Sequence, residues 1–246
     1  MSATYIINDC LDGIFTAVYD SFLYKEQVID LITNCEQVNF LNSYKKIEID
    51  ANKVVKVKNK LKSLLYTTNY NQIKVAFCSG DNKKHLIIFN YLVKIIKCQK
   101  DCTNNLSDID IFKYDNLLSK IRLESHRFKG FIRFEKSKEG VYIAKFSPDN
   151  DITALIFPHF KRRFKNMPFI LCDEKRKIIA LSNKEKSLIT YGDTNIFTLG
   201  DDNEFKKMFK LYHDSVNIKC RKNTRLMLNY LPRRYHAYMP EKDQLL

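Results

Sequence analysis

Residues 141–182 decide the fold class, and they read VYIAKFSPDNDITALIFPHFKRRFKNMPFILCDEKRKIIALS. Val141–Phe146 alternates between apolar and polar side chains, which indicates a strand. Phe169–Asp173 and Lys177–Ser182 flank a short polar turn, which predicts a hairpin. Leu188–Tyr191 adds a further strand. We therefore expect a small antiparallel sheet in this half of the chain.

A helix is predicted between the first two of these strands. Its apolar residues share one helical face: Ile152, Leu155, Ile156, Phe160 and Phe164. Asp149 and Asp151 suit an N-cap region, while Pro158 predicts two short helices or a kink. Helices packed on one side of the sheet make the C-terminal half an α+β arrangement.

The prediction extends outward from this stretch in both directions. Upstream, residues 124–134 run from a helix end into a strand, Gly130–Phe134. Gly130 there indicates a tight bend or the close approach of another chain. Downstream, Asn203–Val216 and Arg221–Tyr230 have helical patterns, and Pro232 ends the second helix.

The N-terminal half predicts a mixed α/β region. Residues 4–8 form a short strand, a turn follows at Asp12-Gly13, and Ile14–Lys25 is helical. We expect extended segments at Tyr44–Asp50 and Val54–Val57. Further helices are predicted at Lys84–Lys97 and Asp110–Glu124.

The polar turn formers of residues 99–108 predict a loop or linker. We therefore divide the chain into an N-terminal mixed α/β region, 1–108, and a basic C-terminal α+β domain, 109–246. One compact unit is the alternative.

Composition limits the class of protein. The chain has 246 residues, 45% of them apolar, with 6 glycines and 5 prolines, which excludes disordered and collagen-like classes. No basic segment precedes the first apolar stretch, and the best apolar run, His85–Lys97, is too short to span a bilayer. We expect a soluble cytoplasmic protein without a membrane partner.

Seven scattered cysteines indicate reduced thiols. The closest pair is Cys98-x3-Cys102, whereas a structural zinc site needs about four ligands. We predict neither a metal site nor a cofactor bound to this chain.

The formal net charge of +14 favours acidic partners such as DNA, RNA or anionic lipid. Residues 1–120 hold 16 Lys+Arg and 13 Asp+Glu, whereas residues 121–246 hold 26 and 15, including all ten arginines. The guanidinium fork suits phosphate, so this half predicts a phosphate-facing surface. Coding bias toward lysine, or ion pairs within this half, are the alternatives.

Three segments rich in Lys and Arg are the candidate nucleic-acid contacts, and they contain Arg127–Arg133, Lys161–Arg163 and Arg221–Tyr235. Strand alternation would place Lys129, Phe131 and Arg133 on one face, which interleaves cations with a ring as single-strand binders do. The alternative is a solvated strand face in the first segment and a solvated helix face in the second, while in the third Tyr235 could simply pack. The candidates are Arg127, Lys129, Phe131, Arg133, Lys161, Arg162, Arg163, Arg221, Arg225, Arg233, Arg234 and Tyr235.

Five further residues are candidates for acid–base or metal-assisted chemistry: Glu124, His126, Asp149, Asp151 and His159. The alternatives are a simple hydrogen bond between Glu124 and His126, and helix capping by the two aspartates. Neighbouring cations predict a pKa of His159 below its usual value.

Several of these motifs occur in one order and spacing. They are Glu124-x-His126-Arg127-x-Lys129-Gly130-Phe131-x-Arg133-Phe134, Phe146-x-Pro148-Asp149-x-Asp151, Pro158-His159-Phe160-x-Arg162-Arg163-Phe164, Arg221-x-Asn223-x-Arg225-Leu226 and Pro232-x-Arg234-Tyr235. Together with the opening Tyr5 to Glu26, they resemble the DUF4130 family of bacterial DNA-metabolism proteins. The chain departs from the family pattern where tryptophans are common, with Phe169, Phe209 and His236 instead.

The resemblance implies a role in DNA metabolism or repair. Family members are small partners of a radical-SAM protein, and some relatives are fused to a uracil-DNA glycosylase-like domain. The resemblance places the iron–sulfur cluster and S-adenosylmethionine in the partner. We expect a DNA-binding accessory protein. The alternatives are an enzyme acting directly on DNA, glycosylase-like or a phosphodiester hydrolase, and a protein–protein adaptor.

Overall fold

A computed structural model of the chain describes residues 2–33, 44–137, 140–183, 185–196, 208 and 224–238. The chain divides into two compact units, Met1–Ile121 and Arg122–Leu246. The division lies within helix α5 (Ile109–Phe131), beyond the loop at residues 99–108 where the sequence placed it. That loop itself is confirmed, and Asp108 ends it by accepting hydrogen bonds from the first amides of α5.

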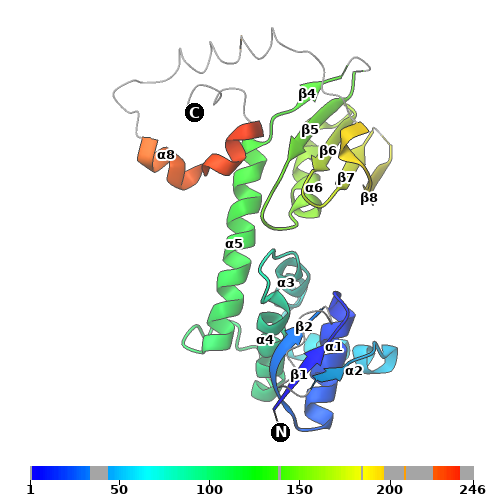
Figure 1. The fold of residues 1–246 in the computed structure, drawn as a ribbon, viewed down its shortest axis with the longest axis vertical. Helices are drawn as coiled ribbons and strands as arrows, with labels where there is room; N and C mark the ends of the chain where they lie inside the picture. The colour runs from blue at the N-terminus through cyan, green and yellow to red at the C-terminus, as the bar shows by residue number, and fades with distance from the viewer. Residues whose placement is uncertain are drawn as a thin grey trace. The chain divides into compact units, whose positions relative to one another are not determined.

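The first unit is built on a parallel sheet of three strands in the order β2-β1-β3 (Figure 1). The central strand is β1 (Ser2–Ile6), and its neighbours are β2 (Gln27–Ile32) and β3 (Tyr44–Lys46). Helix α1 (Leu11–Leu23) links β1 to β2, so the predicted mixed α/β organisation is confirmed.

Three further helices lie wholly within this unit, α2 (Ala51–Leu64), α3 (Thr67–Phe77) and α4 (Lys84–Cys98), and the first part of α5 completes it. Helix α4 is confirmed, but the predicted extended segment Val54–Val57 is wrong. Asp50 caps α2 by accepting from the amides of Asn52 and Lys53 at 2.8 and 3.2 Å. The cap starts a helix whose buried face includes both valines, so it overrides their β preference.

The predicted turn at Asp12-Gly13 is also wrong, because both residues lie in the first turn of α1. A Cβ at position 13 would lie 2.7 Å from the Asn8 carbonyl oxygen. Glycine is therefore required by close packing between α1 and the end of β1.

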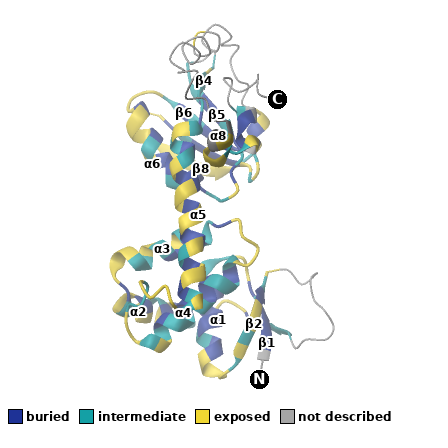
Figure 2. Cartoon of the chain, turned by 90° about the vertical axis from the view of Figure 1, so that its left-hand side faces the viewer, coloured by how far each residue is buried: buried dark blue, intermediate teal, exposed yellow. Residues whose placement is uncertain are grey.

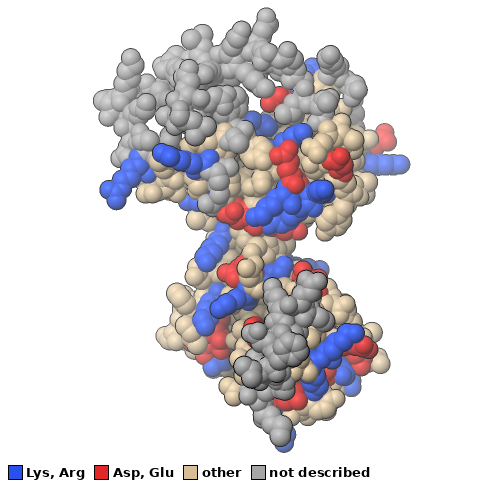
Figure 3. Space-filling view, viewed as in Figure 1, with Lys and Arg blue, Asp and Glu red and all other residues tan. Residues whose placement is uncertain are grey.

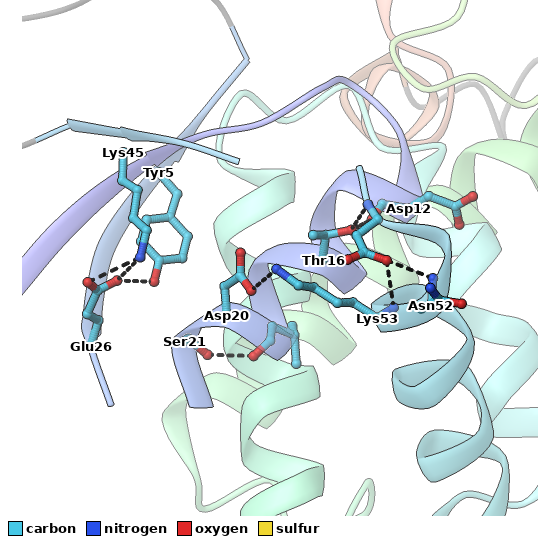
Figure 4. A network of polar contacts seen from close by, with 11 residues as sticks. Tyr5, Asp12, Thr16, Asp20, Ser21, Glu26, Lys45, Asn52 and Lys53 are labelled. Atoms are coloured by element: carbon cyan, nitrogen blue, oxygen red, sulfur yellow. Dashed lines mark hydrogen bonds and ion pairs between the residues drawn. The ribbon is translucent and has the colours of Figure 1, made fainter. Parts of the chain in front are cut away.

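Polar side chains bind the edges of this unit together (Figure 4). The Tyr5 hydroxyl donates to Glu26, whose carboxylate also pairs with Lys45 at 3.3 Å. Lys53 of α2 contacts Asp20 of α1 at 2.7 Å. These pairs fix β1, β2 and β3 to one another and α2 to α1.

The second unit carries a sheet of five strands in the order β4-β5-β6-β7-β8. The strands are β4 (Glu135–Lys136), β5 (Tyr142–Phe146), β6 (Phe169–Asp173), β7 (Ile178–Ser182) and β8 (Ser187–Tyr191). The predicted hairpin is β6–β7, and β8 matches the predicted last strand. The α+β class is confirmed.

The sheet is not wholly antiparallel as predicted. Strands β5 and β6 pair in parallel, with Phe146 opposite Asp173, and helix α6 (Thr153–Phe164) connects them. A parallel pair needs such a crossover helix. Ile156, Phe160 and Phe164 are buried on α6, as their spacing predicted.

Helix α6 is one helix with Pro158 inside it, so the predicted split into two short helices is wrong. Proline removes the hydrogen bond to the carbonyl four residues earlier. Both Pro158 and Ala154 are exposed, so the missing bond lies on the solvent side. The N-cap is Ile152 without a side-chain hydrogen bond, which corrects the capping assigned to Asp149 and Asp151.

Helix α5 continues to Phe131, which corrects the predicted strand Gly130–Phe134. Strand β4 begins later, at Glu135. No atom lies within 4 Å of a Cβ built on Gly130, so neither the bend nor the close approach predicted there is seen.

The core of the second unit is rich in aromatic rings. Phe134 contacts Phe160, Phe164 and Phe169, at centroid distances of 5.1, 4.5 and 6.1 Å. Buried segments of this kind are dark blue in Figure 2. The ring contacts of Phe134 join α6 and the loop before β4 to the sheet.

Three short helices complete the described part of this unit: η2 (Thr194–Ile196), α8 (Thr224–Tyr230) and η4 (Arg233–Tyr238). Helix α8 confirms the later part of the predicted helix Arg221–Tyr230. The predicted helix Asn203–Val216 lies outside the described residues, apart from Met208, which is helical. Within the described residues, every helix is too short or too polar to cross a bilayer.

Candidate functional site

The candidate site lies in the second unit, at the carboxyl ends of the parallel strands β5 and β6. Parallel strands end at the same edge of a sheet, which is where open α/β sheets place their ligand sites. The loop after β5 therefore lies beside Asp173, the last residue of β6. That loop carries Asp149 and Asp151, two of the predicted site residues.

Glu124 of α5 holds this loop in place. Its Oε1 accepts from the Asp149 amide and the Tyr235 hydroxyl, each at 2.7 Å. Its Oε2 accepts from the amide and side-chain nitrogen of Asn150, at 2.8 and 2.6 Å. Glu124 is 6% exposed. We call these four residues the Glu124 bracket, and they join α5, the β5–α6 loop and η4.

Tyr235, predicted to meet a base, is 3% exposed. Its ring packs edge-on against Phe128 of α5 at 4.8 Å. Its hydroxyl lies 3.4 Å from Asp149 Oδ2, in addition to its bond with Glu124. In this geometry the ring belongs to the core and anchors η4.

Arg176 holds the other side of the loop, and sequence reasoning did not select it. Its guanidinium donates to the carbonyls of Pro148 and Asp149 and to Asp173 Oδ2. Asp173 is fully buried, and burial raises the pKa of its carboxyl despite the opposing effect of Arg176. An aspartate ending an apolar strand, with an arginine three residues later, was the available sequence signal.

The exposed carboxylate of Asp149 is thus carried on a backbone fixed from both sides. Glu124 accepts from its amide, and Arg176 donates to its carbonyl. Asp151 is half-buried, while His126 is exposed on α5. Among the described residues, no cluster of three or more His, Cys, Asp or Glu side chains could hold a metal ion.

The charges of three cations act on His159 of α6. Burial lowers the pKa of the His159 imidazole, in the predicted direction. The neighbouring positive charges that lower it further belong to Lys129, Arg162 and Arg163. We call these four residues the His159 cluster. Within the described part of the chain, none of the three cations forms an ion pair.

Two other predicted arginines are occupied at helix ends. Arg133 donates to the carbonyls of Gly130, at 2.7 Å, and Phe131, at 3.2 Å, and so caps the end of α5. Arg127 donates to the Asn229 carbonyl near the end of α8 at 3.0 Å. Cations at helix C-termini compensate the negative end of the helix dipole. Phe131 is half-buried as the last residue of α5.

The remaining candidates are dispersed. Lys161 is exposed on α6, Arg225 on α8 and Arg233 on η4. Arg234 lies in η4, but its side chain is outside the description, and Arg221 lies outside the described residues altogether. Figure 3 shows one face of the molecule, on which basic and acidic side chains are interspersed.

Comparison with known proteins gives one match. A family model described as a domain of unknown function, DUF4130, matches residues 82–241. Neither the curated proteins nor the solved structures contain a match.

Proposed function

The chain belongs to the DUF4130 family, and from this premise we propose that it is a DNA-metabolism protein that binds DNA as the accessory partner of a radical-SAM protein. The observation that carries the proposal is the His159 cluster. Three cations share the environment of one half-buried imidazole, and no carboxylate is among the groups that shift its pKa.

Cations held close together repel one another, and an anion between them relieves that repulsion. Phosphate is the anion that a DNA backbone supplies at regular spacing. Arg162 and Arg163 lie at the C-terminal end of α6, where the helix dipole favours positive charge. The dipole accounts for cations on α6 itself, but Lys129 comes from a different helix. Because the dipole of α6 does not explain the presence of Lys129, the three cations together support phosphate binding more strongly than the two arginines of α6 alone do.

The geometry supports binding more than direct catalysis. Glu124, the most buried of the candidate acids, already accepts four hydrogen bonds. It therefore positions the Asp149 loop. The radical-SAM protein would carry the iron–sulfur cluster and S-adenosylmethionine.

The test is salt-dependent DNA binding by the full chain, with Arg162→Ala/Arg163→Ala as the variant. Each lost phosphate contact should reduce the magnitude of the slope of log K against log salt by about 0.9 on duplex DNA. The slope of the double variant should therefore be smaller in magnitude by roughly 2. Lys175→Ala/Lys186→Ala is the matched control, since both lysines are exposed in the same unit. If the two double variants show equal affinity and slope, the His159 cluster is not the DNA-binding surface.

The partnership needs a separate measurement. We expect the chain to co-purify with the radical-SAM protein encoded beside it after nuclease treatment. Complete loss of the complex on nuclease treatment would show that DNA alone bridges the two proteins, and would remove the direct partnership from the proposal.

A further inference from the structure

The first unit contains a cavity that the DNA-binding proposal does not use. Its volume is about 740 Å³, and it lies between the end of α1, the start of β2 and one face of α4. Small-molecule sites span roughly 300–1,000 Å³. The cavity is therefore large enough for a nucleotide-sized ligand.

One part of the wall is apolar. Phe22, Val28 and Val93 line it, with Phe89 buried beside them. Phe22 is 38% exposed, although it lies in the last turn of a largely buried helix. An exposed ring beside aliphatic groups suits a flat heteroaromatic ring, because bases stack on aromatic faces with little dependence on sequence.

The rim is cationic. Lys25 and Lys97 line the cavity and are exposed, and neither forms an ion pair within the described residues. A third lysine, Lys94, is neutralised by Asp108 at 2.5 Å. Two ammonium groups therefore remain for an anion at the mouth of the cavity.

The acidic groups of the wall do not cancel this charge. Glu26 directs its carboxylate to the Tyr5 hydroxyl and Lys45, as Figure 4 shows. Asp110 acts on Lys94, whose pKa is raised mainly by its hydrogen bond with Asp108 and in smaller part by the Asp110 charge. Glu26 is thus paired with Lys45, whereas Asp110 shares Lys94 with Asp108, so the two positive charges of Lys25 and Lys97 outweigh the one carboxylate left over.

The wall also contains two side-chain amides, those of Gln27 and Asn90. An amide offers a donor and an acceptor together, which matches the edge of a nucleobase. We propose that this cavity binds a nucleotide, with its base against Phe22 and its phosphate at Lys25 and Lys97. The nucleotide is either free or one unit of a nucleic-acid strand. This inference does not rest on the DNA-binding proposal, because it uses a different unit.

Binding of mononucleotides to the full chain tests the inference by calorimetry. The probes are AMP, GMP, CMP and dTMP, with the matching nucleosides and inorganic phosphate for comparison. We expect Lys25→Ala/Lys97→Ala to weaken nucleotide binding about tenfold and nucleoside binding hardly at all. Lys83→Ala/Lys100→Ala removes the same charge from exposed positions outside the cavity and should leave binding unchanged. Phe22→Ala should weaken nucleotides and nucleosides alike.

A short single-stranded oligonucleotide distinguishes the two sources. If mononucleotides fail to bind but Lys25→Ala/Lys97→Ala selectively weakens the oligonucleotide, the site takes a nucleotide within a strand. Equal effects of the two lysine pairs on every probe would overturn the inference. So would competition by phosphate as strong as that by nucleotides, which would reveal a simple anion site. Arg162→Ala/Arg163→Ala should not change mononucleotide binding, so failure of either proposal is recognisable alone.

Discussion

Replacing Glu124 by alanine should unfold the second unit far more easily than any surface change. The substitution removes the acceptor of four hydrogen bonds, of which two come from backbone amides. A buried donor without a partner costs about 1–3 kcal/mol. The Tyr235 hydroxyl keeps Asp149 Oδ2 at 3.4 Å as a second acceptor, so the free energy lost at this hydroxyl is smaller than at the amides.

The two amides and the lost packing together predict a fall of roughly 3–5 kcal/mol in the free energy of unfolding. Glu124→Gln should cost roughly 2–4 kcal/mol. It has the right shape, but its NH₂ group would face the two donors of Asn150 instead of accepting from them.

Urea denaturation followed by circular dichroism gives the free energy, and tyrosine fluorescence gives a second probe because the chain has no tryptophan. Hydrogen exchange at the amides of Asp149, Asn150 and β5 assigns the loss to the second unit. Glu185→Ala is the control, since Glu185 is exposed in the same unit and should change stability by no more than about 0.5 kcal/mol. If Glu124→Ala and Glu185→Ala unfold at the same urea concentration, the bracket does not stabilise this unit.

Three further predictions follow from packing and titration. Gly13→Ala should destabilise the first unit by about 1–3 kcal/mol because its Cβ would meet the Asn8 carbonyl. Gly130→Ala, in open space on α5, should instead stabilise the protein by up to about 1 kcal/mol. Thermal unfolding should therefore show opposite changes in stability for the two variants, and changes in the same direction would contradict this reasoning. Burial lowers the pKa of His85 below its ordinary 6.5, so its contribution to stability is present above that pH and is lost as the pH falls through the lowered pKa. Hydrogen exchange in α4 between pH 7 and 5 should show this loss of stability, and His85→Gln should make the stability less dependent on pH. If the pH dependence is the same in the variant, His85 is not the cause of the loss. Burial raises the pKa of the Cys172 thiol to about 11, so iodoacetamide at pH 8 should label half-buried Cys78 much faster than buried Cys172. Mass spectrometry measures both rates, and equal rates would contradict the burial of Cys172.

Local signals in the sequence were sufficient for several elements. The apolar spacing of α4 and the short polar turn between β6 and β7 act over a few residues, so both elements were predictable. The three valines of α2 favoured extended structure, and only the capping contacts of Asp50 decide for a helix. The parallel pairing of β5 with β6 is non-local, because a whole helix separates the strands, and it was missed for that reason.

The candidate site was predictable in its residue types but not in its contacts. Glu124, Asp149 and Tyr235 were all selected, yet Glu124 lies 25 and 111 residues from the groups it binds. The arginine count also overstated the charge available to a ligand, since Arg127, Arg133 and Arg176 donate to carbonyl groups of the chain itself. Composition reports how many cations exist, but only the fold shows which remain exposed.

The Glu124 bracket has a consequence for how the chain folds during synthesis. Residues 1–121 leave the ribosome early, and their compact unit contains all of its own strands and helices up to α5. Glu124 follows at once, but Tyr235 emerges only 111 residues later. A nascent chain therefore carries a carboxylate destined for the interior without one of its donors until Tyr235 has been synthesised. Truncating the chain before Tyr235 would make that unfinished state permanent.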